Sequence, residues 1–452
     1  MKEIIPDVLA ERYTSSTMVA IWSPKEKVKL MRRLWLAALR AQQELGMPIP
    51  PGTIEAYERV ADSINLASIA KWELETQHDV KANIEEFNAL AGGIEFIHLG
   101  FTSRDVTDNV EQLQIYRSLR LVRDRTVAIL RRLGTHSIEY CFMDICGRSH
   151  NIPGQTTTLG KRFSNFAEEM LIAFDRLEHL IANYPLRGIK GPMGTQQDMV
   201  DLLGSKEKAL EFEEKIRKYL GVPSVLNSVG QVYPRSLDFE VVSTLLQLSS
   251  APGNFAKLIR LMAGHELAYE GFKESGSGST AMPHKMNSRT CERTNGLVNI
   301  LAGFLEMTRS LIGDQWYEGD VSCSVVRRIA LPGAFFTIDG IYESTLTVLD
   351  AMKVFPKMID QELQHYLPFL STTRILMDAV KGGMSRERAH KIIKENAVFA
   401  VQEMRKGLPN TFVERLANDM NFPLDRSRIE KLLENPDHGL APGQANLVCQ
   451  KR

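Results

Sequence analysis

The sequence lacks several features that mark particular classes of protein. It has no excess of either charge, because 55 Lys and Arg residues balance 55 Asp and Glu residues. Nucleic-acid-binding proteins usually show a basic excess or stripe, so no nucleic-acid partner is expected. No run approaches the roughly 20 apolar residues of a transmembrane helix, and the N-terminus lacks the apolar core of a signal peptide. We therefore expect a cytoplasmic protein without a membrane partner.

Cysteine is also scarce. The chain has five cysteines among 452 residues, and their odd number and scattered spacing fit free thiols in a reducing compartment. Cys141 and Cys146 lie close together in the sequence, but no second pair accompanies them. A zinc site needs more clustered Cys and His ligands, so we expect no metal site.

Strand patterns are nearly absent, whereas helical periodicity dominates. Alternating Val, Ile and Thr runs are rare, so strands should be few and short. A first long helix is indicated by apolar residues at spacings of three and four, namely Leu30, Leu34, Ala37, Ala41 and Leu45. Further long helices are predicted from Asp108 to beyond Leu130 and at Thr157–Asn183, Leu237–Phe272, Cys291–Leu311 and Ala330–Met352.

These helices predict an all-α fold of three helical domains. We expect an N-terminal domain over 1–107, a central long-helix bundle over 108–355 and a C-terminal domain over 356–452. A long bundle with apolar residues on more than one face should pair with copies of itself, so an oligomer is expected.

Three polar segments interrupt the helical pattern before residue 200. The first, Thr76–Val80, holds His78, which at a helix start is more simply a cap or a surface residue. The second, His98–Asn109, reads most simply as a turn with Asp108 as N-cap of the long helix. The third, Gly147–Arg162, places His150 on a loop before a helix, where it could meet an anionic ligand or be purely structural.

The fourth segment, Glu274–Arg293, is too specific for a linker and holds the expected centre of the chemistry. Gly276 and Gly278 permit large backbone changes, as a mobile lid requires. Within nine residues the segment offers the hydroxyl of Ser279, the cation of Lys285 and the amide of Asn287. A serine can act as a base only if its alkoxide is stabilised, and Lys285 is the obvious group to help.

Taken in order, these segments resemble the fumarase/aspartase superfamily and, within it, the adenylosuccinate lyase family. The signature loop of the superfamily corresponds to Gly278–Asn287 in this sequence. Two further motifs correspond to Thr102–Asn109 and His78–Val80. The resemblance extends nearly end to end, through Arg12-Tyr13, Arg187–Gln196, Asp314–Arg328 and Leu367–Gly383.

The resemblance implies a β-elimination without a cofactor. Fumarate would leave from a succinyl group that is attached through nitrogen to a purine nucleotide or its imidazole precursor. The resemblance makes Ser279 the base and His150 the acid, with His78 supporting the acid or the leaving group. Lys285 and Asn287 would stabilise the carbanion.

The resemblance also implies the substrate contacts and the assembly. Positions that hold the nucleotide phosphate and nearby groups are Arg12, Tyr13, Ser324 and Arg328. Positions that contact the succinyl part or lie beside His78 are Thr102, Ser103, Gln196, Gln77 and Asp79, and Arg293 is a further ligand contact. The superfamily builds each active site from three chains of a homotetramer, and the same is expected here.

Two departures from the family pattern leave alternatives open. Ile152 stands where the family has a Gln after the acid histidine, and Gly319 stands where it has an Arg. Arg327 or another residue could replace the lost cation. Otherwise the substrate differs, as in an argininosuccinate lyase or a carboxymuconate cycloisomerase-like enzyme. An inactive helical scaffold is the third alternative. The joint retention of His150, Ser279, Lys285 and Asn287 argues against it.

Overall fold

A computed structural model of the chain describes residues 5–271, 282, 284–434 and 438–451. They divide into two compact units. The first unit consists of Met1–Ala128, Met170–Gly253 and Arg293–Leu346, and the second of Ile129–Glu169, Asn254–Glu292 and Thr347–Arg452. Both units are therefore assembled from segments that are distant in the sequence.

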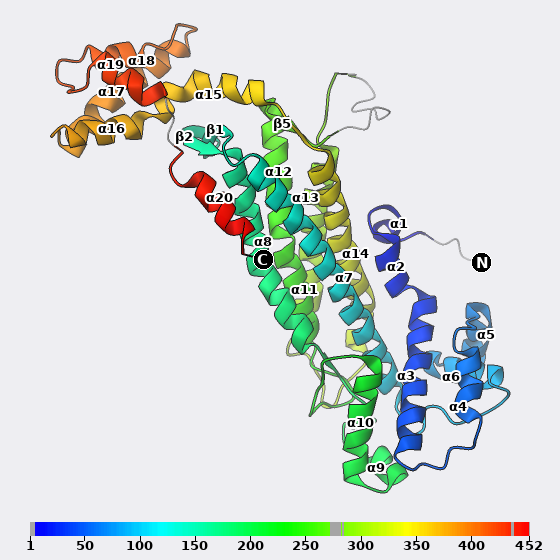
Figure 1. Cartoon of the computed structure of the whole chain (residues 1–452). Helices are drawn as coiled ribbons and strands as arrows, with labels where there is room; N and C mark the ends of the chain where they lie inside the picture. Colours follow the sequence, from blue (N-terminus) through cyan, green and yellow to red (C-terminus); the bar gives the residue numbers. More distant parts are fainter. Residues whose placement is uncertain (1–4, 272–281, 283, 435–437, 452) are drawn as a thin grey trace. The chain divides into compact units, whose positions relative to one another are not determined.

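The first unit contains most of the shorter helices of the N-terminal half (Figure 1). They are α1 (Val8–Arg12), α2 (Ser16–Trp22), α3 (Pro24–Glu44), α4 (Thr53–Val60), α5 (Leu66–Thr76), α6 (Asp79–Leu90), α9 (Gln197–Leu203), α10 (Lys206–Leu220) and α11 (Ser236–Leu248). The buried face of α3 supplies Trp35, whose ring stacks on Phe87 of α6. Strands β3 (Pro185–Leu186) and β4 (Ser224–Val225) pair in parallel in this unit.

Five helices have residues in both units, and four of them are 21 to 37 residues long. They are α7 (Ser103–Glu139), α8 (Leu159–Asn183), α12 (Ser250–Gly264), α13 (Arg289–Arg309) and α14 (Ser322–Ala351). Their lengths match the extended bundle that the sequence predicts, and the all-α fold is confirmed.

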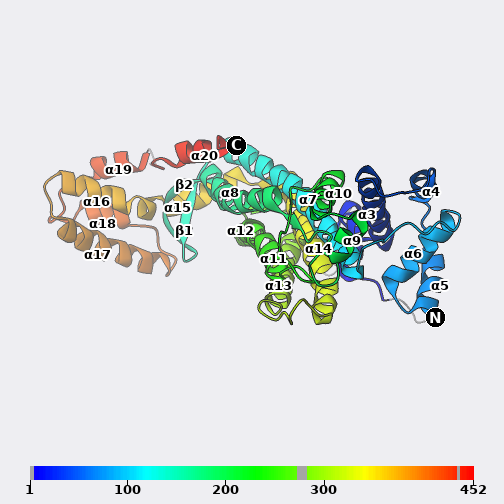
Figure 2. The same ribbon diagram turned by 90° about the horizontal axis from the view of Figure 1, so that it is seen from below.

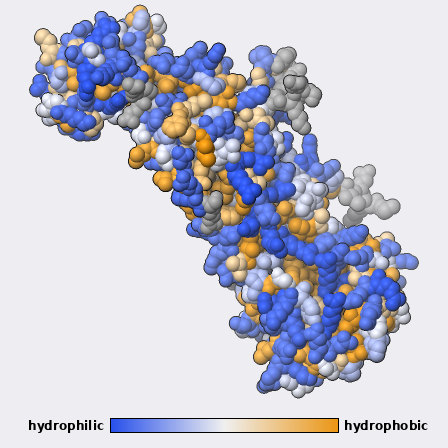
Figure 3. Space-filling view, viewed as in Figure 1, coloured by the Kyte–Doolittle hydropathy of each residue, from blue (hydrophilic) through white to orange (hydrophobic). Residues whose placement is uncertain are grey.

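The second unit holds the remaining elements. Strands β1 (Asp144–Ser149) and β2 (Ile152–Thr158) form an antiparallel hairpin, and β5 (Ala268–Tyr269) pairs with β6 (Lys353–Val354). The helices are α15 (Pro356–Leu370), α16 (Thr372–Lys381), α17 (Arg386–Met404), α18 (Phe412–Ala417), α19 (Arg426–Glu434) and α20 (Ala441–Cys449). Helices α16–α19 pack around one hydrophobic cluster (Figure 2). Their visible outer surface is mostly hydrophilic, as expected for a small helical core (Figure 3).

Two helix boundaries correct the sequence prediction. Helix α7 begins at Ser103, so Asp108 is not its N-cap and instead lies fully buried inside the helix. The helix predicted at Leu237–Phe272 is two helices, because α11 ends at Leu248 and α12 begins at Ser250. All five cysteines are free thiols, as expected. Among the described residues no helix has both the length and the hydrophobicity that a membrane crossing requires.

Candidate active site

The segment Thr102–Asn109 is held in place by the loop that follows β3. The carboxylate of Asp105 pairs with the buried guanidinium of Arg187 and accepts a hydrogen bond from the backbone N–H of Lys190 at 2.9 Å. The side chain of Asn109 exchanges hydrogen bonds with the backbone of Gly188, at 2.9 and 3.0 Å. These buried bonds fix the start of α7 and with it the two predicted succinyl contacts, Thr102 and Ser103.

The first turn of α7 is also capped from within the segment. The backbone N–H of Thr102 donates to the carboxylate of Asp105 at 2.8 Å, in the manner of the return bond in a capping box. Gln196 belongs to the same region, because its amide donates to the carbonyl of Ile189 at 3.1 Å. Since that bond uses the amide N–H, the amide oxygen of Gln196 stays available to a ligand.

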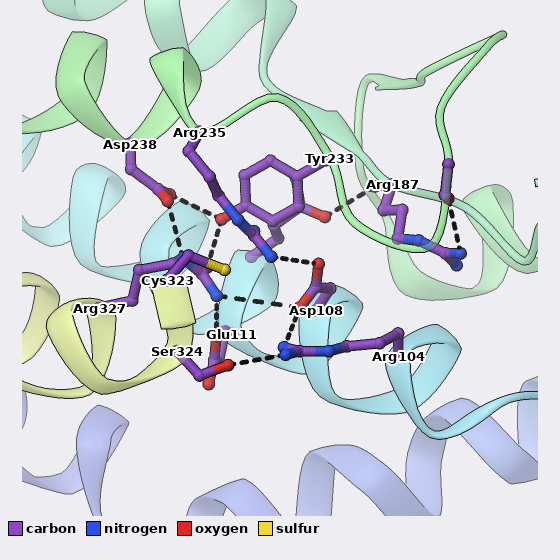
Figure 4. A network of polar contacts seen from close by, with 12 residues as sticks. Arg104, Asp108, Glu111, Arg187, Tyr233, Arg235, Asp238, Cys323, Ser324 and Arg327 are labelled. Atoms are coloured by element: carbon purple, nitrogen blue, oxygen red, sulfur yellow. Dashed lines mark hydrogen bonds and ion pairs between the residues drawn. The ribbon is translucent and has the colours of Figure 1, made fainter. Parts of the chain in front are cut away.

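A buried network of charges lies beneath this segment in the first unit (Figure 4). The carboxylate of Asp108 lies 3.0 Å from Nη2 of Arg235, and Arg327 lies 2.7 Å from Asp238 and 2.6 Å from Glu111. Burial alone would raise the pKa of Asp108, but the charges of the surrounding arginines outweigh it and hold this pKa below its usual value. Asp108 is therefore ionised, and the network links α7, α11 and α14.

Arg104 lies at the edge of that network and reaches the predicted phosphate contact Ser324. Its Nη1 lies 3.2 Å from the carboxylate of Asp108, and its Nη2 donates to Oγ of Ser324 at 2.7 Å. Nη2 also lies 3.5 Å from the carbonyl oxygen of Asp320. This arginine joins the start of α7 to the start of α14.

Helix α14 brings two further predicted contacts to the same place. Ser324 and Arg328 are one helical turn apart and therefore lie on one side of α14. Nη2 of Arg328 lies 3.8 Å from the carboxylate of Asp79, the first residue of α6. The structure thus brings Asp79 close to Arg328, one helical turn from Ser324, and the role of these residues as substrate contacts stays a prediction.

His78 is the N-cap of α6, as its place at a helix start suggested. Its Nδ1 accepts a hydrogen bond from the backbone N–H of Lys81 at 3.3 Å. Because Nδ1 is the acceptor, the neutral imidazole carries its proton on Nε2. About half of the His78 side chain is exposed, so this N–H is free to face a ligand. Gln77, which precedes it, is exposed and caps the end of α5.

A second histidine, His98, lies near His78 and was not identified from the sequence. Its Nδ1 accepts a hydrogen bond from Nε1 of Trp35 at 3.2 Å. Burial, with smaller contributions from the positive charges of His78 and Lys81, lowers the pKa of His98 to about 4. At neutral pH, His98 is therefore uncharged, and Trp35 fixes its proton on Nε2.

The predicted contacts near the N-terminus form a separate group in the first unit. The guanidinium of Arg293, on α13, lies 5.5 Å from the centre of the Tyr13 ring, a cation–π contact. Arg12 is the last residue of α1 and its side chain is exposed. The pair of Tyr13 and Arg293 links α1 to α13 and leaves Arg12 open to solvent.

In the second unit, His150 lies at the tip of the hairpin of β1 and β2, which corrects the expected loop before a helix. His150 and Asn151 form a two-residue turn with φ values of 52° and 61°, and positive φ at both positions is the mark of a type I′ turn. The His150 side chain is exposed and has no hydrogen-bond partner among the residues that the structure describes. The structure exposes this predicted acid, and it brings His150 to no other predicted residue among those that it describes.

The signature loop is described only in part. Ser279, Gly276 and Gly278 lie outside the described residues, whereas Lys285 is described and exposed and Asn287 is half-buried. Glu270, which precedes the loop, accepts hydrogen bonds from the backbone N–H groups of Thr290 and Cys291, each at 2.9 Å. One buried carboxylate therefore holds the two flanks of the loop together.

Of the two departures from the family pattern, Gly319 has a local structural explanation and Ile152 has none. Gly319 has a φ of 140°, and a Cβ there would lie 2.7 Å from Cγ2 of Val232, so no arginine fits this backbone. Arg327 does not replace it, because its side chain is 1% exposed and is bound by Asp238, Glu111 and Tyr233. Ile152, directly after the turn, is 65% exposed and offers no polar contact.

Arg104 and His98 are the residues of the site region that sequence reasoning missed. Both lie in the polar segment His98–Asn109, from which only Thr102 and Ser103 were selected. Arg104, a charged residue between the motif's Ser103 and Asp105, was a usable signal. No sequence signal links His98 to Trp35. Within the described ranges, no cluster of three or more His, Cys, Asp or Glu residues could hold a metal ion.

Two family models match the chain. One, described as "Lyase", matches residues 4–303, and the other, described as "Adenylosuccinate lyase C-terminus", matches residues 368–442. Adenylosuccinate lyase from Saccharomyces cerevisiae is 32% identical over 98% of this chain and 93% of its own length. The same enzyme from Schistosoma mansoni is 30% identical over 94% of this chain and 90% of its own.

Solved structures share the fold. A fumarate lyase from Mesorhizobium sp. BNC1 superposes with a TM-score of 0.84 at 19% identity, covering 100% of both chains. A 3-carboxy-cis,cis-muconate lactonizing enzyme from Pseudomonas putida gives a TM-score of 0.83 at 18% identity, covering 98% of each chain. The long-helix architecture, the lyase family match over most of the chain and the near full-length relatives agree. The chain belongs to the adenylosuccinate lyase family of the fumarase/aspartase superfamily.

Proposed function

We propose that this chain releases fumarate by β-elimination from adenylosuccinate, giving AMP. We propose the same reaction on succinylaminoimidazole carboxamide ribotide, giving aminoimidazole carboxamide ribotide. The observation that carries the proposal is the near full-length similarity to adenylosuccinate lyases, 32% and 30% identical, in a chain that places Ser324 and Arg328 on one side of α14. Arginine suits a phosphate because its planar guanidinium can donate two parallel hydrogen bonds.

Each chemical step has a proposed residue. Ser279, as an alkoxide, removes a proton from the succinyl carbon next to a carboxylate, and the electron pair enters that carboxylate as an aci-carboxylate. The electron pair then forms the carbon–carbon double bond of fumarate as the carbon–nitrogen bond breaks. His150 protonates the departing nitrogen. Participation of a general acid or base is typically worth about 10²–10⁴-fold each.

The charge that develops on the substrate needs cations and N–H donors. Lys285, which is exposed, is the proposed partner of the aci-carboxylate, together with Asn287. His78 presents its Nε2–H to the leaving group or to His150, because its Nδ1 is held by the backbone of α6. No step requires a cofactor.

We propose a homotetramer in which three chains contribute to each active site. Exposed apolar side chains recur at every fourth residue from just before α14 into its first turns, at Val321, Val325 and Ile329, which are 71%, 67% and 56% exposed. Contact with other copies would bury this stripe. Ser324 and Arg328 lie on the adjacent side of α14, so a subunit interface there would run beside the substrate contacts. The cytoplasm is the proposed location.

A substrate panel tests the proposal against its enzyme alternatives. Purified protein is incubated with adenylosuccinate, argininosuccinate and 3-carboxymuconate in parallel, and fumarate, AMP and lactone are quantified. We expect turnover of adenylosuccinate alone. Turnover of argininosuccinate or of the muconate in its place would contradict the proposed substrate, and no turnover of any of the three would favour an inactive scaffold.

A further inference from the structure

We propose that Arg104 is a further binding contact for the phosphate group of the nucleotide substrate, an inference that rests on the proposed function. Nothing in the family motif Thr102–Asn109 requires an arginine between Ser103 and Asp105. In this chain the guanidinium at that position reaches across to α14 and donates to Oγ of Ser324 at 2.7 Å. Arg104 would then determine how tightly phosphorylated substrates bind.

The geometry leaves Ser324 able to bind phosphate at the same time. Arg104 is the donor in its bond with Ser324, so the hydroxyl of Ser324 retains its own hydrogen for an acceptor. Arg328 lies one helical turn further on the same side of α14. A phosphate placed at Ser324 would therefore meet its hydroxyl donor and the guanidinium of Arg104, with Arg328 one helical turn further along the same side of α14.

Accessibility separates Arg104 from the other arginines of the network. Arg327 and Arg235 have side chains that are 1% and 4% exposed, whereas the side chain of Arg104 is 12% exposed at the rim (Figure 4). Arg327 already pairs with both Asp238 and Glu111. Arg104 shares the single carboxylate of Asp108 with Arg235, at 3.2 and 3.0 Å. Arg104 is the most accessible of the three arginines.

The position of Arg104 also accounts for the missing arginine at Gly319. Nη2 of Arg104 lies 3.5 Å from the carbonyl oxygen of Asp320, the residue after Gly319. The backbone of Gly319 cannot accept a side chain without a clash with Val232, and Arg327 is committed elsewhere. Arg104 therefore supplies, from α7, a cation beside the segment that lacks one of its own.

The test pairs two substrates that differ only in the phosphate. We would measure kcat and KM of the wild-type enzyme and of Arg104→Gln with adenylosuccinate and with succinyladenosine, its dephosphorylated form. Loss of a charge-assisted hydrogen bond should raise KM for adenylosuccinate about 10- to 100-fold with little change in kcat. The kcat/KM of succinyladenosine should stay within about twofold. Calorimetric binding of AMP and of adenosine gives the same comparison without turnover.

Two further variants keep the test decisive. Arg123→Gln removes a partly exposed arginine of α7 that pairs with Glu178 at 2.6 Å, and it should change neither substrate's constants. Arg104→Lys retains the positive charge and replaces Arg104→Gln if that variant fails to fold. Its loss of affinity should be smaller and should again be confined to adenylosuccinate and AMP. An equal loss of kcat/KM for both substrates, or no loss for adenylosuccinate, would overturn the inference. A wild-type enzyme inactive on adenylosuccinate would instead overturn the proposed function.

Discussion

The carboxylate of Glu270 accepts a hydrogen bond from the backbone N–H of Cys291 at 2.9 Å, and so joins two residues on opposite sides of the signature loop. The same carboxylate accepts the N–H of Thr290 at 2.9 Å. Glu270 is buried, so both bonds are protected from water. The loop is long, but its two flanks are fixed by a single side chain.

We therefore predict that Glu270→Ala lowers kcat about 10-fold or more. The loop that carries Lys285 and Asn287 would lose the anchor of its two flanks, and misplacement of catalytic groups by about 1 Å can cost as much as 100-fold. Steady-state kinetics with adenylosuccinate gives the readout. Glu306→Ala is the control, because it removes an exposed carboxylate near the other end of α13. Equal kcat for wild type and Glu270→Ala would show that the anchor has no catalytic consequence.

Shared active sites predict complementation between two inactive variants. Ser279→Ala lacks the proposed base and His150→Ala the proposed acid, so each homotetramer alone should retain at most a few per cent of wild-type activity. Mixed tetramers would contain some sites with both residues intact if the two side chains come from different chains. Activity should therefore recover after the subunits are exchanged under mild denaturation. Failure to recover, with exchange verified by native mass spectrometry, would count against sites shared in this way.

The environment of His98 predicts how stability depends on pH. Its pKa is about 4 in the folded state, against the usual histidine value of 6.5, so the unfolded chain binds more protons between these values. The contribution of His98 is thus complete above pH 6.5 and is lost as the pH falls to about 4. The expected slope is at most about 1.4 kcal/mol per pH unit.

Urea unfolding of wild type and His98→Asn between pH 7 and pH 4 measures this contribution. Asparagine tolerates the φ of 66° at this position and can still accept the bond from Trp35. The free energy of unfolding of the wild type should fall more steeply with decreasing pH than that of the variant. Parallel pH curves for the two proteins would contradict the assignment of a buried, neutral His98.

From the backbone conformation of Gly319 we predict that restoring the family arginine at this position lowers the stability of the protein. Gly319→Arg and Gly319→Ala both place a Cβ against Val232 on a backbone with a φ of 140°. Each should lower the free energy of unfolding by about 1–3 kcal/mol, as expected for a strained backbone. Gly264→Ala is the matched control, since nothing lies within 4 Å of a Cβ there. Thermal unfolding measures all three variants, and a Gly319→Ala protein as stable as wild type would contradict the strain.

The sequence predicts the helices well where apolar residues recur regularly, as in α3, and less well where a buried polar residue resembles a cap. Asp108 is of a residue type that favours the N-cap, and it lies near the expected helix start. It is nevertheless buried against Arg235 and Arg327, which are far away in the chain. The helix starts earlier because Asp105 provides the capping carboxylate. Contacts of this kind depend on tertiary structure and leave no local pattern.

The candidate site was predictable in its residue types and less so in its local geometry. The motifs identify His78, Ser324 and Arg328, and the structure places Ser324 and Arg328 on one side of α14. The hairpin at His150 was not predicted, because its turn residues are His and Asn without glycine. The catalytic roles of the site residues and the division into three consecutive domains stay predictions.

Proton NMR of the purified enzyme with adenylosuccinate tests whether the chain releases fumarate by β-elimination with Ser279 as the base, because it quantifies both products in the same sample. We predict one fumarate for each AMP from the wild type. We also predict that Ser279→Ala forms neither product although it still binds adenylosuccinate. Products in another ratio, or a Ser279→Ala variant that retains more than a few per cent of the wild-type rate, would contradict the account.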